Sequence, residues 1–319
     1  MSALLVAIPL CIALAFQAFW IIRLKRTTVD EVLEYKTSNS SPSNISDLSV
    51  TVFEVEINQQ PKRVLEVGGV SYRGKSHFSS GLARQDSYCL MRFGSQVVLC
   101  VADGVSNSKL SHIGSGFVTL NIEKALSEVF PSGITEDPES WMKVNHWLSN
   151  GLVKVHESNL QRRGSPIGDD PVARRLSAAN DLATTFELII CDLQIDENGY
   201  LPGMYVRLAG DGVIFGSEVA RTMAGFVRVE DYEKNHEVTA LPVTDETAKV
   251  QKFNLIPGDY LALVTDGIGD LLTSDVRFAS EFDADFAKRK LTRLGLSKAI
   301  LRYSNGTSDD LTLVIARLK

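Results

Sequence analysis

The chain has 319 residues, which allows about two domains of ordinary size, or one large domain with an appendage. Hydrophobic residues make up 44% and charged residues 23% of it, which excludes a disordered or collagen-like protein. The formal net charge of −6 gives no basic footprint, so nucleic acid is not predicted as a partner. The four cysteines lie far apart without a Cys-x-x-Cys pair, which argues against a zinc site or a disulfide framework.

An uncharged apolar run opens the chain, over residues 3–22. A helix rising about 1.5 Å per residue over this run would be roughly 30 Å long, the thickness of the bilayer's hydrocarbon core. Arg23, Lys25 and Arg26 follow it and no basic residue precedes it, so the positive-inside rule predicts a membrane anchor over 1–26 with the rest of the chain in the cytoplasm. A cleaved signal peptide would have a basic start and a shorter apolar core, and a buried core helix would have a polar face.

Residues 27–49 include a Ser- and Asn-rich stretch, which predicts a flexible linker, and one domain is predicted over 50–319. Its predicted strands are apolar, β-branched runs bounded by turn residues, at 50–57, 63–72, 87–94, 95–104, 183–193, 204–216, 221–229, 249–255, 259–267 and 311–318. Its predicted helices have apolar residues at helical spacing, at 114–130, 138–164 and 287–303, and a loop is predicted over 164–181. Strands and helices do not alternate, which predicts an α+β domain with helices covering sheets.

Acidic residues mark the ends of several predicted strands. Asp103-Gly104, Asp211-Gly212 and Asp266-Gly267 each end a strand, and Asp309-Asp310 directly precedes the last one. A single Asp-Gly after a strand is usually only a turn. If the four strand ends converge, however, their carboxylates repel one another unless cations lie between them. Oxygen ligands without His or Cys select Mg²⁺ or Mn²⁺ over zinc, so the pattern favours an acidic metal centre over unrelated turns.

The same segments carry a family resemblance over about residues 65–319. The segments are SHFSSGLARQDSY (76–88), LCVADGVSNS (99–108), LATTFEL (182–188), VRLAGDGVIFG (206–216), LALVTDGIGDLL (261–272) and SDDLTLVIA (308–316). In this order they resemble the successive motifs of the type 2C metal-dependent Ser/Thr protein phosphatases, and of the bacterial subgroup in particular. The resemblance implies a four-layer α-β-β-α sandwich that holds two metal ions at one edge of the central β-sandwich.

The resemblance also implies a set of metal ligands. Carried over by position, these are Asp103, Gly104, Asp266, Asp309, Asp211 and Asp270. Asp103 would bridge two Mg²⁺ or Mn²⁺ ions, and the carbonyl oxygen of Gly104 would bind one of them. Asp211 and Asp270 match residues that, with Asp266, form a third and weaker site in the family, so two or three divalent ions are expected.

The catalytic and substrate-binding residues follow the family's first motif. Asp86 lies where that motif ends and Gln85 stands where many members have Glu, so both are expected at the catalytic site. Many relatives grip the phosphate with an Arg five residues before this Asp, where this chain has Gly81. Arg84 and His77 are the nearest substitutes and are predicted to bind substrate, although an exposed Arg is more often merely solvated and a His beside a site is more often structural.

Other positions also depart from the family pattern. Val105 stands where some eukaryotic members have a His proposed as general acid, and Asp310 replaces the usual final Asn. Thr184 and Thr185 match small hydroxyl residues of the family, and packing is the role we expect for them. Protonation of the leaving group would therefore fall to metal-bound water, with His77 or His112 as alternatives.

The resemblance implies hydrolysis of phosphoserine and phosphothreonine in proteins by metal-activated water. The expected partners are phosphorylated proteins, including membrane-associated ones, and a cognate Ser/Thr kinase. A pseudophosphatase, which keeps the fold as a binding or regulatory module, is the alternative; Gly81, Gln85 and Val105 favour it, while the retained metal aspartates oppose it. A phosphatase for small phosphoesters is a third interpretation, and it would need a closed pocket.

Overall fold

The computed structural model describes residues 47–57, 63–210, 212–216, 239–243, 248–287 and 290–319. The chain divides into two units, Met1–Thr37 and Ser38–Lys319, and all described residues belong to the second. Within these ranges no helix combines the length and the apolarity that crossing a membrane requires. The predicted membrane anchor over 1–26 and the predicted strand over 221–229 lie outside the described residues.

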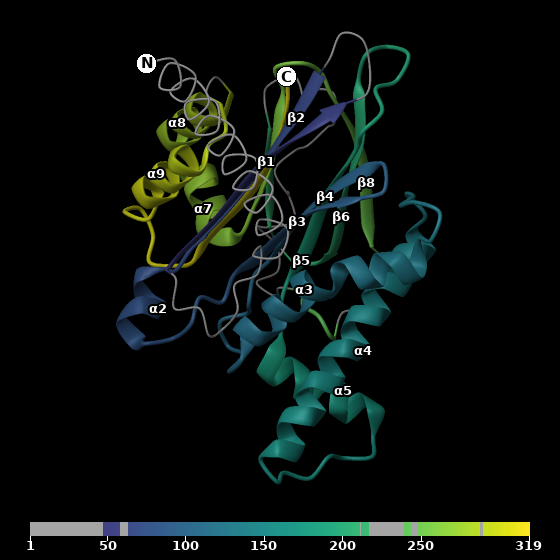
Figure 1. Cartoon of the computed structure of the whole chain (residues 1–319). Coiled ribbons are helices and arrows are strands. Elements are labelled where there is room, and N and C mark those ends of the chain that lie inside the picture. Colours follow the sequence, from purple (N-terminus) through teal and green to yellow (C-terminus); the bar gives the residue numbers. More distant parts are fainter. Residues whose placement is uncertain (1–46, 58–62, 211, 217–238, 244–247, 288–289) are drawn as a thin grey trace, which may run out of the picture. The chain divides into compact units, whose positions relative to one another are not determined.

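The described residues of the second unit form two five-stranded antiparallel sheets at its centre (Figure 1). The first sheet runs in the order β1 (Leu48–Ile57), β2 (Arg63–Tyr72), β10 (Leu311–Leu318), β9 (Tyr260–Val264) and β7 (Val213–Gly216). The second sheet runs in the order β3 (Ser87–Phe93), β4 (Gln96–Ala102), β5 (Phe186–Asp192), β6 (Leu201–Ala209) and β8 (Lys249–Leu255). The predicted α+β fold is confirmed.

Helices lie on both outer faces of the sheets. The helices α3 (Ser111–Val129), α4 (Pro138–Arg162) and α5 (Pro171–Leu182) enclose a buried cluster with the second sheet. The helices α7 (Asp266–Ser274), α8 (Val276–Ala287) and α9 (Arg293–Tyr303) enclose another with the first sheet, and a third cluster fills the space between the sheets. The three clusters stack the layers in the order helix, sheet, sheet, helix.

The apolar run of β4 shows why this stacking suits the sequence. Alternate side chains of a strand point to opposite faces of its sheet. Val97, Leu99 and Val101 enter the cluster between the sheets, whereas Val98 and Cys100 enter the cluster beneath the helices. Because both faces are covered, an unbroken apolar strand is buried along its whole length, and it carries the following Asp103 to the edge of the sandwich.

Part of the predicted loop over 164–181 is wrong, because Pro171–Leu182 form the helix α5. The Asp170 side chain accepts a hydrogen bond from the Val172 amide at 3.0 Å, and Pro171 occupies the first turn. An Asp cap followed by Pro is a helix-start signal. The Asp and Pro that resemble loop composition are therefore the residues that begin the helix.

Three other predicted boundaries also change. The predicted strand over 204–216 is two strands, because Gly210, with a φ of 120°, turns the chain from β6 in one sheet to β7 in the other. The predicted helix over 287–303 begins only at Arg293, and α7 and α8, which were not predicted, precede it. The strand β1 begins at Leu48, two residues before the start of the predicted strand over 50–57.

Candidate metal centre

The ends of strands from both sheets bring acidic residues to one place. Asp86 directly precedes β3 and Asp103 directly follows β4, both in the second sheet. Asp266 begins α7 just after β9, and Asp310 directly precedes β10, both on the side of the first sheet. Of the strand ends predicted to converge, those of Asp103 and Asp266 lie together, and Asp86 of the first motif joins them.

The backbone around Asp103 is fixed by two threonines. The Asp103 carbonyl oxygen accepts hydrogen bonds from the Thr185 amide and the Thr184 hydroxyl, both at 2.8 Å, and the Asp103 amide donates to Thr185 Oγ1 at 2.8 Å. A side chain at Gly104 would place its Cβ 2.8 Å from the Ser111 Cβ, so glycine is needed for the close approach of α3. Thr184 and Thr185 are buried, as expected of packing residues, and they also hold the backbone of the predicted bridging residue.

The three carboxyl groups lie together, with Asp86 buried and Asp103 and Asp266 half-buried. Those of Asp86 and Asp266 both lie in hydrogen-bonding contact with that of Asp103. Burial raises the pKa of Asp103 well above its usual range, and the charges of Asp86 and Asp266 raise it further. Burial, and then the charge of Asp310, raises the pKa of Asp86 to about 7, although Thr265 Oγ1 donates a hydrogen bond to Asp86 Oδ2 at 2.7 Å. Ionising all three groups together is therefore unfavourable without a cation.

Asp310 connects the segments on either side of α2 (Lys75–Ser80). Its side chain is 2% exposed and accepts hydrogen bonds from the Gly74 amide at 2.6 Å and the Gln85 amide at 2.5 Å. His77 Nδ1 lies 2.9 Å from Asp310 Oδ1, and this contact raises the pKa of His77. A Cβ at Gly74 would lie 2.3 Å from the carbonyl carbon of Asp309, so any larger residue at this position would clash with the Asp309 backbone. Asp310 is thus a positioning residue, a role that its match to the family's Asn did not reveal.

The predicted substrate-binding and catalytic residues of the first motif are partly engaged elsewhere. Arg84 Nη1 donates a hydrogen bond to the Ser71 carbonyl oxygen at 3.0 Å. Gln85 contributes its backbone, because its amide binds Asp310 and its carbonyl oxygen accepts a hydrogen bond from Ser115 Oγ. His77 is buried against Asp310. A role for Arg84 and His77 in binding substrate, and for Gln85 at the catalytic site, stays a prediction.

The predicted third site is only partly described. Asp266 and Asp270 lie four residues apart on α7, a spacing that places two side chains on the same face of a helix. Asp270 is exposed. Burial raises the pKa of Asp309, and the charges of Asp310 and Asp270 raise it further. Asp211 lies outside the described residues.

The donors present fit a hard divalent cation. They are carboxylate and backbone carbonyl oxygens, the ligands that Mg²⁺ and Mn²⁺ prefer. Burial, and then neighbouring negative charge, raises the pKa of Asp86 and of Asp103, and a cation would offset that charge. Among the described residues, no group of three or more His, Cys, Asp or Glu side chains is placed so that all of them could bind one metal ion. Since Mg²⁺ is usually held by one or two carboxylates and several waters, an ion here would complete its shell with water and the Gly104 carbonyl oxygen.

Most of the described domain matches a known protein family. The model of the family described as protein phosphatase 2C matches residues 73–294. The chain belongs to the protein phosphatase 2C family. Membership implies metal-dependent dephosphorylation of serine and threonine in proteins, and it confirms the resemblance seen in the motifs. No curated protein sequence matches the chain significantly.

Solved structures of similar fold include bacterial phosphatases at low sequence identity. A bacterial serine phosphatase is 12% identical with a TM-score of 0.50, over 78% of this chain and 96% of the other. The phosphatase domain of SpoIIE from Bacillus subtilis, with a fragment of its regulatory domain, is 17% identical with a TM-score of 0.46, over 87% and 72%. PstP in complex with two manganese ions is 15% identical with a TM-score of 0.44, over 80% and 99%. At this identity the first comparison supports the phosphatase 2C fold alone.

Proposed function

We propose that this member of the protein phosphatase 2C family is an active phosphatase that hydrolyses phosphoserine and phosphothreonine in proteins. The observation that carries the proposal is the contact of Asp86, Asp103 and Asp266, which come from the ends of strands in two different sheets. A chain that kept the fold only as a scaffold would have no need to gather three carboxyl groups, one buried and two half-buried, because removing charged groups from water costs free energy without a cation.

The residues that would hold the ions are Asp103, Asp266, Asp309 and the carbonyl oxygen of Gly104, with Asp86 beside Asp103. When bound, Mg²⁺ or Mn²⁺ would activate the attacking water and offset the charge that develops on the phosphoryl group. The protein's own part is to fix geometry. Thr184 and Thr185 hold the backbone of Asp103, and Thr265 orients Asp86.

The proposal is tested by phosphate release from peptides in the presence of Mn²⁺. We expect the purified chain to hydrolyse phosphoserine and phosphothreonine peptides, and to hydrolyse a phosphotyrosine peptide of the same sequence more slowly. Hydrolysis of small metabolic phosphoesters at rates far above those of all peptides would favour the small-phosphoester interpretation. Binding of the peptides without any turnover, at any Mn²⁺ concentration, would favour the pseudophosphatase.

We also propose that the predicted anchor over 1–26 tethers the phosphatase domain to the cytoplasmic face of a membrane. The support is the apolar run over 3–22 and the basic residues that directly follow it. Membrane-associated phosphoproteins, and the kinase that modifies them, would then meet the enzyme at raised effective concentration. Protease added outside intact cells should leave the domain uncut; digestion of the domain by that protease would show an exported enzyme.

A further inference from the structure

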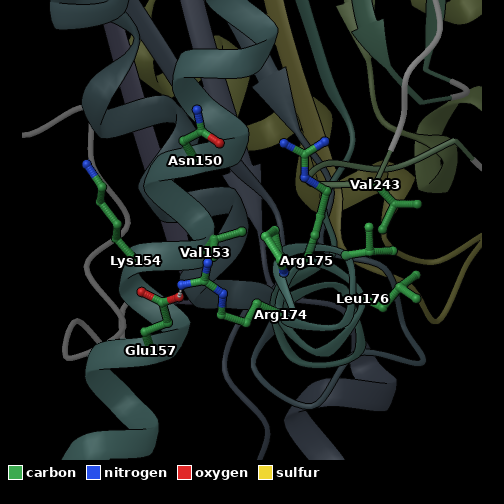
Figure 2. Close-up of a pocket in the computed structure, with 10 residues that line it drawn as sticks. Asn150, Val153, Lys154, Glu157, Arg174, Arg175, Leu176 and Val243 are labelled. Carbon is green, nitrogen blue, oxygen red and sulfur yellow. Dashed lines mark hydrogen bonds and ion pairs between the residues drawn. The ribbon is translucent and has the colours of Figure 1, made fainter. Parts of the chain in front are cut away.

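A pocket separate from the metal centre lies between α4 and α5. Its volume is about 580 Å³, within the range of sites that bind small molecules or side chains. Asn150, Val153, Lys154 and Glu157 of α4 line it, with Arg174, Arg175 and Leu176 of α5 and with Val243 (Figure 2). The chemistry proposed above uses none of these residues.

The charges of the pocket favour an anionic occupant. Its lining has three cationic side chains, Lys154, Arg174 and Arg175, and one carboxylate, Glu157, in a chain whose net charge is −6. Glu157 is paired with Arg174 at 2.9 Å, as the dashed line in Figure 2 marks. The Nε atom of Arg174 is buried and has no hydrogen-bond partner within the described structure. A carboxylate is the group that complements such a cluster.

Aliphatic side chains lie beside the charged ones. Val172 is 66% exposed, Leu176 is 51% exposed and Val243 is 39% exposed, and all three line the pocket. Exposed aliphatic side chains gathered at a pocket with convergent polar groups are typical of a binding surface rather than of scattered surface residues. The occupant should therefore carry an aliphatic side chain next to its negative charge.

The pocket is joined to the metal centre through backbone contacts. Val243 follows Leu241, which pairs with Thr184 through hydrogen bonds of 2.9 and 3.2 Å between their backbones. Thr184 in turn donates its hydroxyl to the Asp103 carbonyl oxygen. Along α5, the six residues from Leu176 to Leu182 span roughly 9 Å at about 1.5 Å per residue. An extended peptide covers a similar distance in about three residues. Because Leu182 lies two residues before Thr184, which contacts Asp103, a few more residues are needed to extend from the pocket to the metal centre.

We propose that this pocket docks an acidic segment of the protein substrate, with an aliphatic residue beside the carboxylates, about four to six residues from the phosphoserine or phosphothreonine. The proposal rests on the phosphatase function proposed above. It makes Lys154, Arg175 and Leu176 determinants of which phosphoproteins the enzyme selects. The metal centre hydrolyses the phosphate ester, and the pocket contributes to substrate selectivity.

Two phosphoserine peptides test this proposal. One carries Glu-Glu-Leu five residues from the phosphoserine, and the matched peptide carries Gln-Gln-Ser at the same positions. The KM of the wild-type chain should be about three- to tenfold lower for the acidic peptide, a range consistent with one or two exposed ion pairs. The double variant Lys154→Glu/Arg175→Glu should lose this preference, and Leu176→Ser should reduce it. All variants should keep the wild-type turnover of an aryl phosphate.

Matched controls lie on α9, in the helical layer over the other sheet. Lys298→Glu changes the charge of an exposed lysine, and Leu294→Ser removes a leucine that is 65% exposed. Both should keep the preference for the acidic peptide. An equal KM for the two peptides in the wild type, or an unchanged preference in the double variant, would overturn the docking proposal. If the aryl phosphate is not hydrolysed at all, the phosphatase proposal fails, and fluorescence anisotropy of the labelled acidic peptide then decides docking separately.

Discussion

The Asp103→Asn variant should lose metal-dependent phosphatase activity by at least about a hundredfold, because even partners outside the ligand set cost about 10–100-fold in metal affinity or activity when removed. Asp103 is in contact with both Asp86 and Asp266, so an Asn at this position removes a carboxylate that lies between the two. Phosphate release from an aryl phosphate, measured over a range of Mn²⁺ concentrations, gives the loss in turnover and in metal affinity.

A matched variant, Asp270→Asn, distinguishes a bridging ligand from a general effect of removed charge. Asp270 is exposed on α7 and belongs to the predicted weaker site, so its loss should reduce turnover less than that of Asp103. Unfolding is not the expected cause of inactivity in Asp103→Asn. Because the folded chain raises the pKa of Asp103, ionised Asp103 costs stability at neutral pH, and a neutral Asn removes that cost. Equal metal affinity in the wild type and Asp103→Asn would show that the bridging assignment is wrong.

The Arg317→Met variant should lose about 3–5 kcal/mol of unfolding free energy, the cost of leaving one member of a buried ion pair unpaired. Glu66 is fully buried on β2 and lies directly opposite Arg317 of β10. Arg317 Nε donates a hydrogen bond to Glu66 Oε2 at 2.9 Å, and Nη2 donates to the same oxygen. Lys319 also donates a hydrogen bond to Glu66. Because the Lys319 side chain is 41% exposed, its ion pair offsets only part of the loss of the Arg317 charge.

Lys252→Met is the matched control for this second prediction. Lys252 pairs with Glu136 at 2.6 Å, but the two side chains are 72% and 54% exposed. Such a surface pair contributes about 1 kcal/mol or less. Urea denaturation of both variants measures the difference, and the double variant Glu66→Gln/Arg317→Met should recover part of the loss. A loss in Arg317→Met no larger than that in Lys252→Met would refute the assigned role of the buried pair.

Much of the fold could be predicted from the sequence because burial leaves a regular pattern. The strand β4 reads as an unbroken apolar run since both of its faces are covered. The helix α5 could not be predicted from composition, because Asp170 and Pro171 serve as cap and first turn while resembling loop residues. Similarly, Asp266-Gly267 looks like a turn after a strand, yet Asp266 begins α7.

The candidate site, like the fold, could be predicted from the sequence only in part. The strand-end aspartates were visible in the sequence, and the structure brings Asp86, Asp103 and Asp266 together. The residues that position them were not visible, because their partners are distant in the chain. Asp310 binds the Gly74 amide 236 residues away, and Thr265 binds Asp86 across 179 residues. Hydrogen bonds between residues so far apart along the chain leave no periodic signal in a single sequence.

The central claim is that the acidic cluster is a catalytic metal centre, and one measurement tests it most directly. The purified chain, freed of metal, is assayed for phosphate release from an aryl phosphate with EDTA and then with increasing Mn²⁺. We expect no turnover in EDTA, turnover that rises and saturates with Mn²⁺, and full recovery when excess Mn²⁺ follows EDTA. Equal turnover with and without the chelator, or none at any concentration of Mn²⁺ or Mg²⁺, would contradict it.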